Sequence, residues 1–223
     1  MEVANELMVR GLVVGVFQEN CWVVGNRRTG EAICIDPGED PEEILALARD
    51  MGVRIKVIAN SHAHLDHVLG VYGVHRQTGS KFLLHEADLD LLQNGWQGAV
   101  AQMGLDIEHG PPDPDGFVRD GDIVEVEGLR LQVISTPGHT PGSVSYYTEG
   151  LLFSGDTLFR GSIGRTDLPG GDYDQELASI CDRLLTLPDN TIVLPGHMQE
   201  TSVETEKRQN PFVLDWQQRR AAR

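Results

Sequence analysis

The stretch N-S-H-A-H-L-D-H-V-L-G, residues 60–70, gathers ligand-type side chains within a few positions. It places His62, His64 and His67 beside Asp66 in a chain that has 8 histidines in all. In an extended loop the rings of His62 and His64 point the same way, while Asp66 and His67 follow the bend and face a neighbouring position. Zinc, iron and manganese favour imidazole together with carboxylate, whereas calcium prefers oxygen alone. This spacing can supply ligands to two metal ions.

The position of this cluster also indicates function. The apolar run I-K-V-I-A-N at 55–60 predicts a β-strand that leads directly into it, and residues 68–79 predict a helix after it. The cluster therefore occupies a strand-to-helix loop. In α/β sheets, ligands bind outside the ends of the strands, where loops gather on a rigid scaffold.

Three further positions end apolar strands in the same way. His139 lies in S-T-P-G-H-T-P-G, Asp156 in F-S-G-D-T-L-F and His197 in L-P-G-H. The adjacent glycines let the backbone pack closely around such a site. The other histidines are isolated in the sequence, and we assign no functional role to His75, His85 and His109.

Length and charge limit the class of protein. A chain of 223 residues can bury its own core, and we predict a single domain over 1–223. A net charge of −16, from 34 acidic and 18 basic residues, argues against nucleic acid and membrane surfaces as partners. Cys21, Cys34 and Cys181 show no CxxC spacing, which favours a reducing compartment and packing roles. The N-terminus lacks a signal-peptide pattern, and we predict a cytoplasmic protein.

The remaining pattern is that of an α/β protein. Residues 7–36 predict an antiparallel meander, 37–52 a helix that ends at Gly52, and 86–94 another helix. Residues 95–120 predict an irregular insertion, because Gly and Pro are frequent in G-P-P-D-P-D-G. A helix is expected over 172–187, with one apolar face. Residues 200–223 predict a short C-terminal helical tail, interrupted at Asn210-Pro211.

In this order and spacing, H-A-H-L-D-H, P-G-H-T, S-G-D-T-L-F and P-G-H resemble the metallo-β-lactamase superfamily, and within it the glyoxalase II-like hydrolases. The resemblance implies a four-layer αββα sandwich with a dinuclear metal site at one edge of the sheets. It implies two divalent ions, zinc first and iron or manganese as alternatives. Carried onto this chain, it assigns one ion to His62, His64 and His139, the second to Asp66, His67 and His197, and the bridging position to Asp156.

The resemblance also implies a reaction. A hydroxide between the two ions would cleave a thioester, S-lactoylglutathione or a related acyl thioester, since zinc lowers the pKa of its bound water to about 7. Asp66 and Asp156 are the candidate catalytic residues. Arg165, in G-R-T-D after the bridging aspartate, is the candidate substrate-binding residue. The expected partner is a small-molecule acyl thioester. The sequence does not indicate whether the protein is a monomer or an oligomer. Asp167 and Gln199 replace two tyrosines that contact glutathione in that family, so another acyl carrier stays open.

Other functions fit the same residues. A mononuclear iron persulfide dioxygenase would use the positions of His62, His139 and Asp156, a two-histidine-one-carboxylate set. A lactonase or another ester hydrolase on the same fold is a further alternative. A non-enzymatic binding module would be expected to have lost at least one ligand, and all seven positions are filled.

Overall fold

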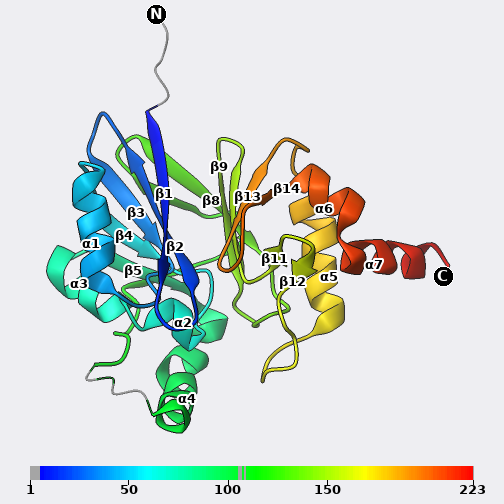
Figure 1. The fold of residues 1–223 in the computed structure, drawn as a ribbon, viewed down its shortest axis with the longest axis horizontal. Coiled ribbons are helices and arrows are strands. Elements are labelled where there is room, and N and C mark those ends of the chain that lie inside the picture. Colours follow the sequence, from blue (N-terminus) through cyan, green and yellow to red (C-terminus); the bar gives the residue numbers. More distant parts are fainter. Residues whose placement is uncertain (1–5, 105–106, 108, 223) are drawn as a thin grey trace, which may run out of the picture. The chain divides into compact units, whose positions relative to one another are not determined.

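The computed structural model describes residues 6–104, 107 and 109–222, and Figure 1 shows its elements. These residues fall into two compact units. The first unit comprises the chain up to 118 together with 123–131, and the second comprises 119–122 and 132–223. The prediction of one domain over 1–223 stays a prediction beside these two units.

The first unit is built on a mixed sheet in which strands β1 to β6 lie in chain order. The predicted meander over 7–36 is confirmed, since β1 (Leu7–Val14), β2 (Glu19–Asn26) and β3 (Glu31–Ile35) pair antiparallel. The next strands pair parallel: β4 (Arg54–Ala59), β5 (Lys81–His85) and β6 (Gly116–Val118). Strand β7 (Ile123–Val126) lies against β3 and β4. Because β3, β4 and β5 are parallel, their carboxyl ends meet at one edge of the sheet.

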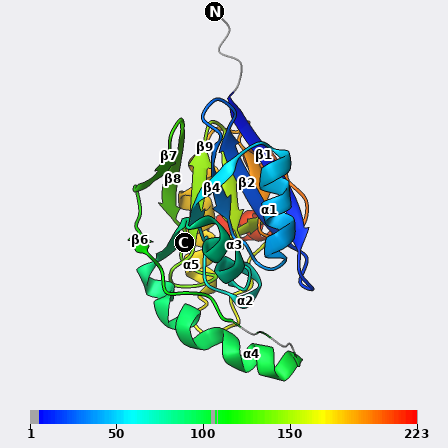
Figure 2. The ribbon, with the colours of Figure 1, turned by 90° about the vertical axis from the view of Figure 1, so that its left-hand side faces the viewer.

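Two helices cover one face of this sheet, as Figure 2 shows. Helix α1 (Pro41–Asp50) starts with a proline and two glutamates, which suit the first turn, and it follows the predicted 37–52 pattern. Its buried side chains pack with those of α3 (Val71–Thr78) on apolar strand residues. Each fully buried aliphatic side chain contributes about 1.5–3 kcal/mol. Cys21 and Cys34 belong to this core, with their sulfur atoms 3.5 Å apart and no disulfide.

The segment after β5 differs from prediction. Residues 86–94 form a 3₁₀ turn and the start of a π-helical turn, and a regular helix, α4 (Trp96–Met103), follows. The prediction of an irregular segment over 95–120 is therefore wrong for its first part and for β6. The glycines and prolines that indicated a loop lie beyond α4. Gly104, at φ +67°, ends the helix in the left-handed conformation that suits glycine.

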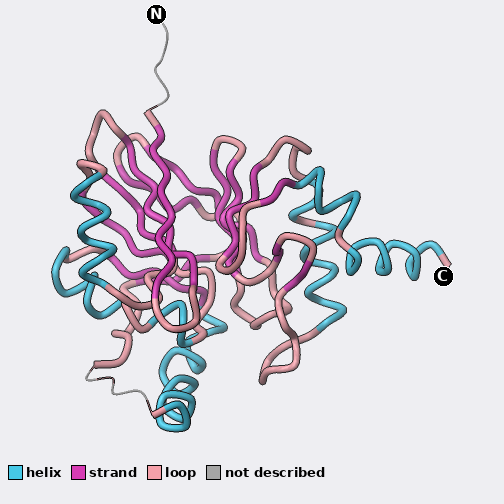
Figure 3. The backbone as a smooth tube through the Cα atoms, in the orientation of Figure 1, coloured by secondary structure: helices cyan, strands magenta, loops and turns pink. Residues whose placement is uncertain are grey.

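The second unit repeats the combination of sheet and helices. Its strands lie in the order β14 (Thr201–Ser202), β13 (Ile192–Pro195), β10 (Leu151–Gly155), β9 (Val144–Thr148) and β8 (Leu129–Ser135, from Gln132 on in this unit). The segment after β10 contains a short hairpin of β11 (Leu158–Phe159) and β12 (Ser162–Ile163). Figure 3 shows the helices of this unit gathered beside its strands.

The helices of the second unit follow the predicted pattern. Helix α5 (Tyr173–Asp182) packs Leu177 and Ile180 in the same core as Leu152 of β10 and Val193 of β13. The C-terminal tail consists of α6 (Val203–Gln209) and α7 (Pro211–Ala221). The side chain of Asn210 caps α7 by accepting from the backbone N–H groups of Phe212 and Val213, which explains the break. Within the described residues, no helix has the length and apolarity to cross a membrane.

Candidate metal centre

Four of the predicted ligands gather in the first unit, at the carboxyl end of β4. Residues 60–64 form the loop, and α2 (Leu65–Val68) begins directly after His64, so that Asp66 and His67 lie on its first turn. The ring centroid of His62 lies 4.8 Å from that of His64 and 4.1 Å from that of His67. Nε2 of His67 lies 3.9 Å from Oδ2 of Asp66. The loop and the short helix thus present these four side chains together, as the strand-end position predicts.

Asp36, at the end of β3, orients two of these histidines. Its Oδ2 accepts from Nδ1 of His67 at 3.1 Å and from the hydroxyl of Ser61 at 2.6 Å, and its Oδ1 accepts from the backbone N–H of Ser61. Since the Ser61 hydroxyl gives its hydrogen to Asp36, it accepts from Nδ1–H of His62 at 2.9 Å. The protons of both rings are therefore on Nδ1, and Nε2 of each ring is the unprotonated nitrogen.

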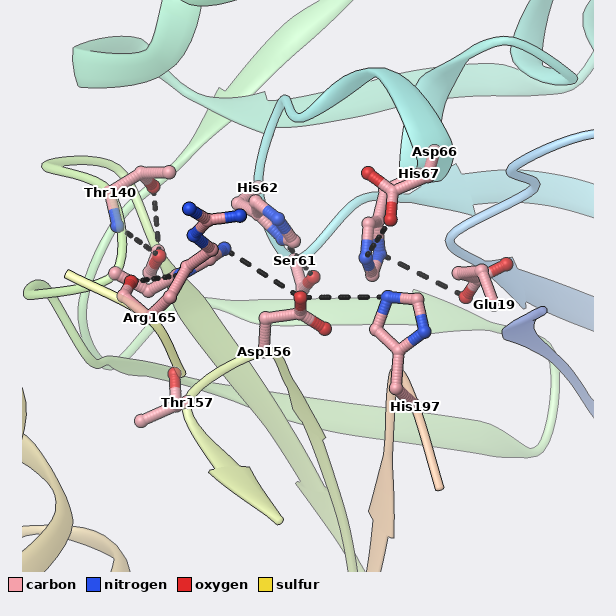
Figure 4. A network of polar contacts seen from close by, with 12 residues as sticks. Glu19, Ser61, His62, Asp66, His67, Thr140, Asp156, Thr157, Arg165 and His197 are labelled. Carbon is pink, nitrogen blue, oxygen red and sulfur yellow. Dashed lines mark hydrogen bonds and ion pairs between the residues drawn. The ribbon is translucent and has the colours of Figure 1, made fainter. Parts of the chain in front are cut away.

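Other acidic groups surround this cluster. Glu19 on β2 is fully buried, and its Oε1 lies 3.8 Å from Nδ1 of His67, as Figure 4 shows. Burial raises the pKa of Glu39, and the negative charges of Asp40 and Asp66 raise it further, against a backbone hydrogen bond that lowers it. The clustering of carboxylates around buried histidines gives a local negative potential that a cation would relieve.

The other three predicted ligands gather in the second unit, each just after a strand. His139 follows β8, Asp156 follows β10 and His197 follows β13. One carboxylate oxygen, Oδ2 of Asp156, lies 3.7 Å from Nε2 of His139 and 3.6 Å from Nε2 of His197. Figure 4 shows this carboxylate directed toward the His197 ring. One carboxylate oxygen therefore lies near two histidine nitrogens, a grouping of ligand-type atoms that a cation could bind.

The protein backbone orients His139. Its Nδ1–H donates to the backbone carbonyl of Arg165 at 2.7 Å, which leaves Nε2 toward Asp156. Its backbone N–H donates to Oε2 of Glu176 on α5 at 2.9 Å. Burial raises the pKa of Glu176 to about 9, with a further increase from the Asp156 charge, against hydrogen bonds from the backbones of His139 and Gly164. Gly138 makes this contact possible, because an added Cβ would lie 2.3 Å from Cα of Glu176.

The predicted substrate-binding residue, Arg165, is exposed. Its guanidinium forms a two-point ion pair with Asp167 at 2.8 and 2.9 Å, and this contact lowers the pKa of Asp167. The arginine thus has two separate parts: a backbone carbonyl that orients His139, and a side chain held at the surface by its neighbour. Arg160 donates to Gln199 at 3.0 Å on the same unit.

The donor atoms fit a divalent transition metal. The separations of 3.6 to 3.9 Å between Nε2 and carboxylate oxygen atoms exceed a hydrogen bond. Two ligands at about 2.0–2.1 Å from a tetrahedral zinc ion lie roughly 3.3–3.5 Å apart, close to these values. The ligand set of imidazole and carboxylate is the one that zinc, iron and manganese favour.

Sequence reasoning missed the side chains that support the ligands. Asp36 carried a usable signal, because A-I-C-I-D ends an apolar strand in a carboxylate, as F-S-G-D does for Asp156. Glu19 and Glu176 lie within a strand and a helix, and no local pattern distinguishes them from exposed acids. The three histidines without an assigned role lie in other contacts, with His75 beside Asp115, His85 capping a turn and His109 against Tyr72.

Comparison with known proteins defines the class. A family model described as the metallo-β-lactamase superfamily matches residues 14–197, and the chain belongs to this superfamily. The predicted family and its α/β fold are thereby confirmed. Membership indicates a hydrolase that depends on divalent metal ions.

Particular relatives extend this result. Over 203 residues the chain is 35% identical to a hydroxyacylglutathione hydrolase, GloC, from Haemophilus influenzae, covering 90% of this chain and 95% of the relative. It is similar to the crystal structure of the B3 metallo-β-lactamase BLEG-1, with a TM-score of 0.85 and 35% identity over 92% of this chain and 99% of that one. It is also similar to TTHA1623 in a di-iron-bound form, with a TM-score of 0.81 and 39% identity over 91% and 99%.

Proposed function

We propose that this protein is a dinuclear metal-dependent hydrolase that cleaves an acyl thioester, in the manner of the glyoxalase II-like hydrolases. The observation that carries the proposal is the carboxylate oxygen of Asp156 facing Nε2 of both His139 and His197. Support comes from the 35% sequence identity to a hydroxyacylglutathione hydrolase along nearly the whole chain. It also comes from the similarity to a structure in a di-iron-bound form.

The two groups together would supply the ligands of two ions. In this proposal His62, His64 and His139 would hold one ion, Asp66, His67 and His197 would hold the other, and Asp156 would be shared between them. Zinc is our first choice, with iron or manganese as alternatives. When bound, two such ions would lower the pKa of a coordinated water molecule and polarise a carbonyl group.

The chain's own residues would orient the histidine rings and hold their protons in place. Asp36 and Ser61 keep protons on Nδ1 of His67 and His62, and the Arg165 carbonyl does so for His139. This fixes each ring in the tautomer that offers Nε2, so no proton has to leave these rings when a metal binds. Asp66, on the first turn of α2, is the residue we propose to orient the attacking water.

The substrate would be a small acyl thioester. A thiolate is a good leaving group, so the reaction requires little acid assistance. We propose that the Arg165 guanidinium binds an acidic group of the thiol carrier, exchanging part of its contact with Asp167 for the substrate. The free thiols of Cys21 and Cys34, side by side, fit the reducing, cytoplasmic location that we propose.

The experiment combines metal analysis with an assay. Protein purified without added metal is analysed for zinc, iron and manganese, and then assayed for hydrolysis of S-lactoylglutathione. We expect two metal equivalents and thioester cleavage. His64→Ala should lose part of one metal equivalent and most of the hydrolysis, whereas His85→Ala should retain both. An unchanged rate in His64→Ala would contradict the assignment of the first metal position.

A second candidate is β-lactam hydrolysis, because BLEG-1 is a B3 metallo-β-lactamase and the similarity covers nearly the full length of both chains. The same preparation is therefore assayed with a β-lactam and with a lactone. Hydrolysis of these without thioester cleavage would replace the proposed substrate. One iron equivalent, with oxygen consumed in the presence of glutathione persulfide, would instead support the mononuclear dioxygenase.

A further inference from the structure

A cavity of about 280 Å³ lies in the first unit, at the amino end of β4. Its walls come from the last turns of α1 and α3 and from the first residues of β4. The metal ligands His62 and His64 follow the opposite end of this strand. With six residues at about 3.3 Å each, β4 separates the cavity from that loop by roughly 20 Å.

Three basic side chains line this cavity: Arg49, Arg54 and Lys56. In a chain with a net charge of −16, such a grouping is notable because acids outnumber bases almost twofold. Within the described residues, none of the three forms an ion pair. Gln77, which also lines the cavity, donates to Glu42 at 2.6 Å, so the nearby acid has an amide partner.

Within the described residues, eight of the other basic side chains have an acidic partner. Ion pairs hold Arg28, Arg130, Arg165, Arg183, Lys207, Arg208, Arg219 and Arg220. The cavity therefore collects cations whose positive charge the protein itself leaves without a close counter-charge. A bound anion would supply that charge.

The pairing register of β4 shifts at one of these cations, which is itself exposed. In the pairing of β3 with β4, Ala32 lies opposite Ile55 and Ile33 lies opposite Val57, so Lys56 is the extra residue. Bulges are uncommon in parallel pairs. Both Ile55 and Lys56 line the same cavity.

The floor of the cavity is apolar. Leu45, Ala48 and Ile55 line it, and each is buried, with 7%, 4% and 3% of its surface exposed. Cations above an apolar floor suit a ligand that has an anionic head and a small apolar body. The volume of about 280 Å³ is just below the usual range for small-molecule sites, about 300–1,000 Å³, which suits a small ligand.

We propose that this cavity binds a small organic dianion, a phosphate monoester or a dicarboxylate, with its charged group on Arg49, Arg54 and Lys56 and its apolar part on Leu45 and Ile55. This site is separate from the proposed metal centre and does not depend on the proposed function. The charge on the ligand would replace the counter-charge that the three cations lack.

The test uses the zinc-loaded full chain and phenylphosphonate, a dianion at mildly alkaline pH that hydrolases do not cleave. We expect the backbone amide NMR signals of Arg54, Lys56 and Thr78 to shift on titration, and calorimetry to give tighter binding than for inorganic phosphate. Lys56→Met keeps an apolar stem and removes the charge, and it should weaken binding roughly ten-fold or more. The matched control is Arg10→Gln, on an exposed arginine of β1 outside the cavity.

Three results would overturn the proposal. One is a set of shifts confined to the amides after β4, which would mean that the probe binds at the metal centre. Another is equal weakening by Lys56→Met and Arg10→Gln, which would mean that net charge alone determines binding. The third is inorganic phosphate binding as tightly as phenylphosphonate, which would remove the apolar part of the ligand class. If Lys56→Met does not fold, the positions of the shifted amide signals in the wild-type protein decide whether the probe binds in the cavity.

A parallel titration with the dicarboxylate phenylmalonate shows whether the cavity prefers a phosphate-type or a carboxylate-type dianion.

Discussion

The carboxylate of Asp36 accepts three hydrogen bonds, and through them it determines the tautomers of two proposed metal ligands. It acts directly on His67 and, through the Ser61 hydroxyl, on His62. The relay requires a hydroxyl at position 61, which Ser61 supplies. Asp36 is a positioning residue in the proposed centre, because it touches ligands and not the metal.

Asp36→Asn is the direct test of this role. The amide keeps one acceptor oxygen but places a second donor against Ser61 or His67, and one of these hydrogen bonds must break. Metal affinity, measured by competition with a chelating dye, should fall about 10–100-fold, as is typical for outer ligands of metal-binding histidines. Asp115→Asn, at a carboxylate away from the cluster, should leave the affinity unchanged. An Asp36→Asn protein with normal affinity would assign the orientation of these rings to packing alone.

The sequence alone identified the seven proposed ligands but not the residues that orient them. Ligands were visible because each follows an apolar strand and belongs to a metal-binding residue type, as with His62 and Asp156. Glu176 was not visible, since its contact with the backbone of His139 depends on the approach of α5, 37 residues further along the chain. Such contacts between distant segments are set by tertiary packing, which local patterns do not encode.

At the scale of elements, the turn after β3 and helix α2 pack with almost no space between them. Gly38 in this turn approaches the backbone of Asp66, and its carbonyl accepts from the N–H of Gly70 at 2.7 Å. An added Cβ at position 38 would lie 1.9 Å from the Asp66 carbonyl oxygen and 2.9 Å from Oε2 of Glu19. The turn therefore requires glycine so that α2 can hold Asp66 in place.

Gly38→Ala should accordingly destabilise the fold and weaken metal binding together. We expect a loss of about 1–3 kcal/mol in the free energy of unfolding, measured by urea denaturation, because the backbone of α2 must move. The matched variant is Gly98→Ala in α4, where an added Cβ meets nothing within 4 Å. It should stabilise the protein by about 0.5–1 kcal/mol, the usual gain for alanine over glycine in a helix. Equal effects of the two substitutions would refute the close packing at Gly38.

A second contact between elements links β5 to the segment before β6. Oδ2 of Asp115 accepts from the backbone N–H of Phe82 at 2.8 Å and lies 3.2 Å from Nε2 of His75 on α3. The hydrogen bond from Phe82 lowers the pKa of Asp115, and His75 lowers it further, against a smaller effect of burial. The ionised form is therefore favoured by folding.

This shift predicts a pH dependence of stability. Because the folded pKa is lower than the unfolded value of about 3.9, the contribution is complete above that value and disappears as the pH falls through the folded pKa. The difference in free energy of unfolding between the wild-type protein and Asp115→Asn should be about 1 kcal/mol or less near neutral pH, since the site is partly exposed. It should vanish in acid. A difference that grew with acidification below the unfolded pKa would reverse the sign of this linkage.

The prediction of elements from sequence worked where strands carry the site and failed in the segment before β6. Strand β4 and the helix that follows were predictable because an apolar run and a glycine-punctuated helical pattern flank the histidines. Helix α4 was not predicted, since a nearby concentration of glycine and proline outweighed the Ala and Gln residues of W-Q-G-A-V-A-Q-M. Residues 105, 106 and 108 of that same predicted segment lie outside the described part of the chain.

At the scale of the whole molecule, the acidic excess and the proposed metal centre are connected. The chain carries a net charge of −16, and its carboxylates include the buried Glu19 and Asp36 close to His67. Concentrated negative charge destabilises a compact chain through self-repulsion, and two divalent cations would cancel part of it. The proposed ligands span positions 62 to 197, so binding would depend on a large part of the fold being formed.

Removing the metal should therefore lower stability as well as activity. A ligand that binds the folded chain alone stabilises it by about 2.7 kcal/mol when its free concentration is 100 times its dissociation constant. For a chain of 223 residues, each kcal/mol shifts the melting temperature by roughly 2–4 °C, so chelation should lower it by about 5–11 °C. Readdition of zinc should restore the melting temperature of the wild-type protein. It should restore less of it in His197→Ala, because this variant lacks a proposed ligand of the second ion and the ring that faces Asp156.

Added salt should raise the melting temperature of the chelated protein more than that of the metal-loaded protein, because screening replaces part of the missing positive charge. The control is protein shown to contain metal before chelation. Identical melting curves with and without chelator would show that metal binding does not stabilise the fold, and would contradict the claim that the ions offset the negative charge.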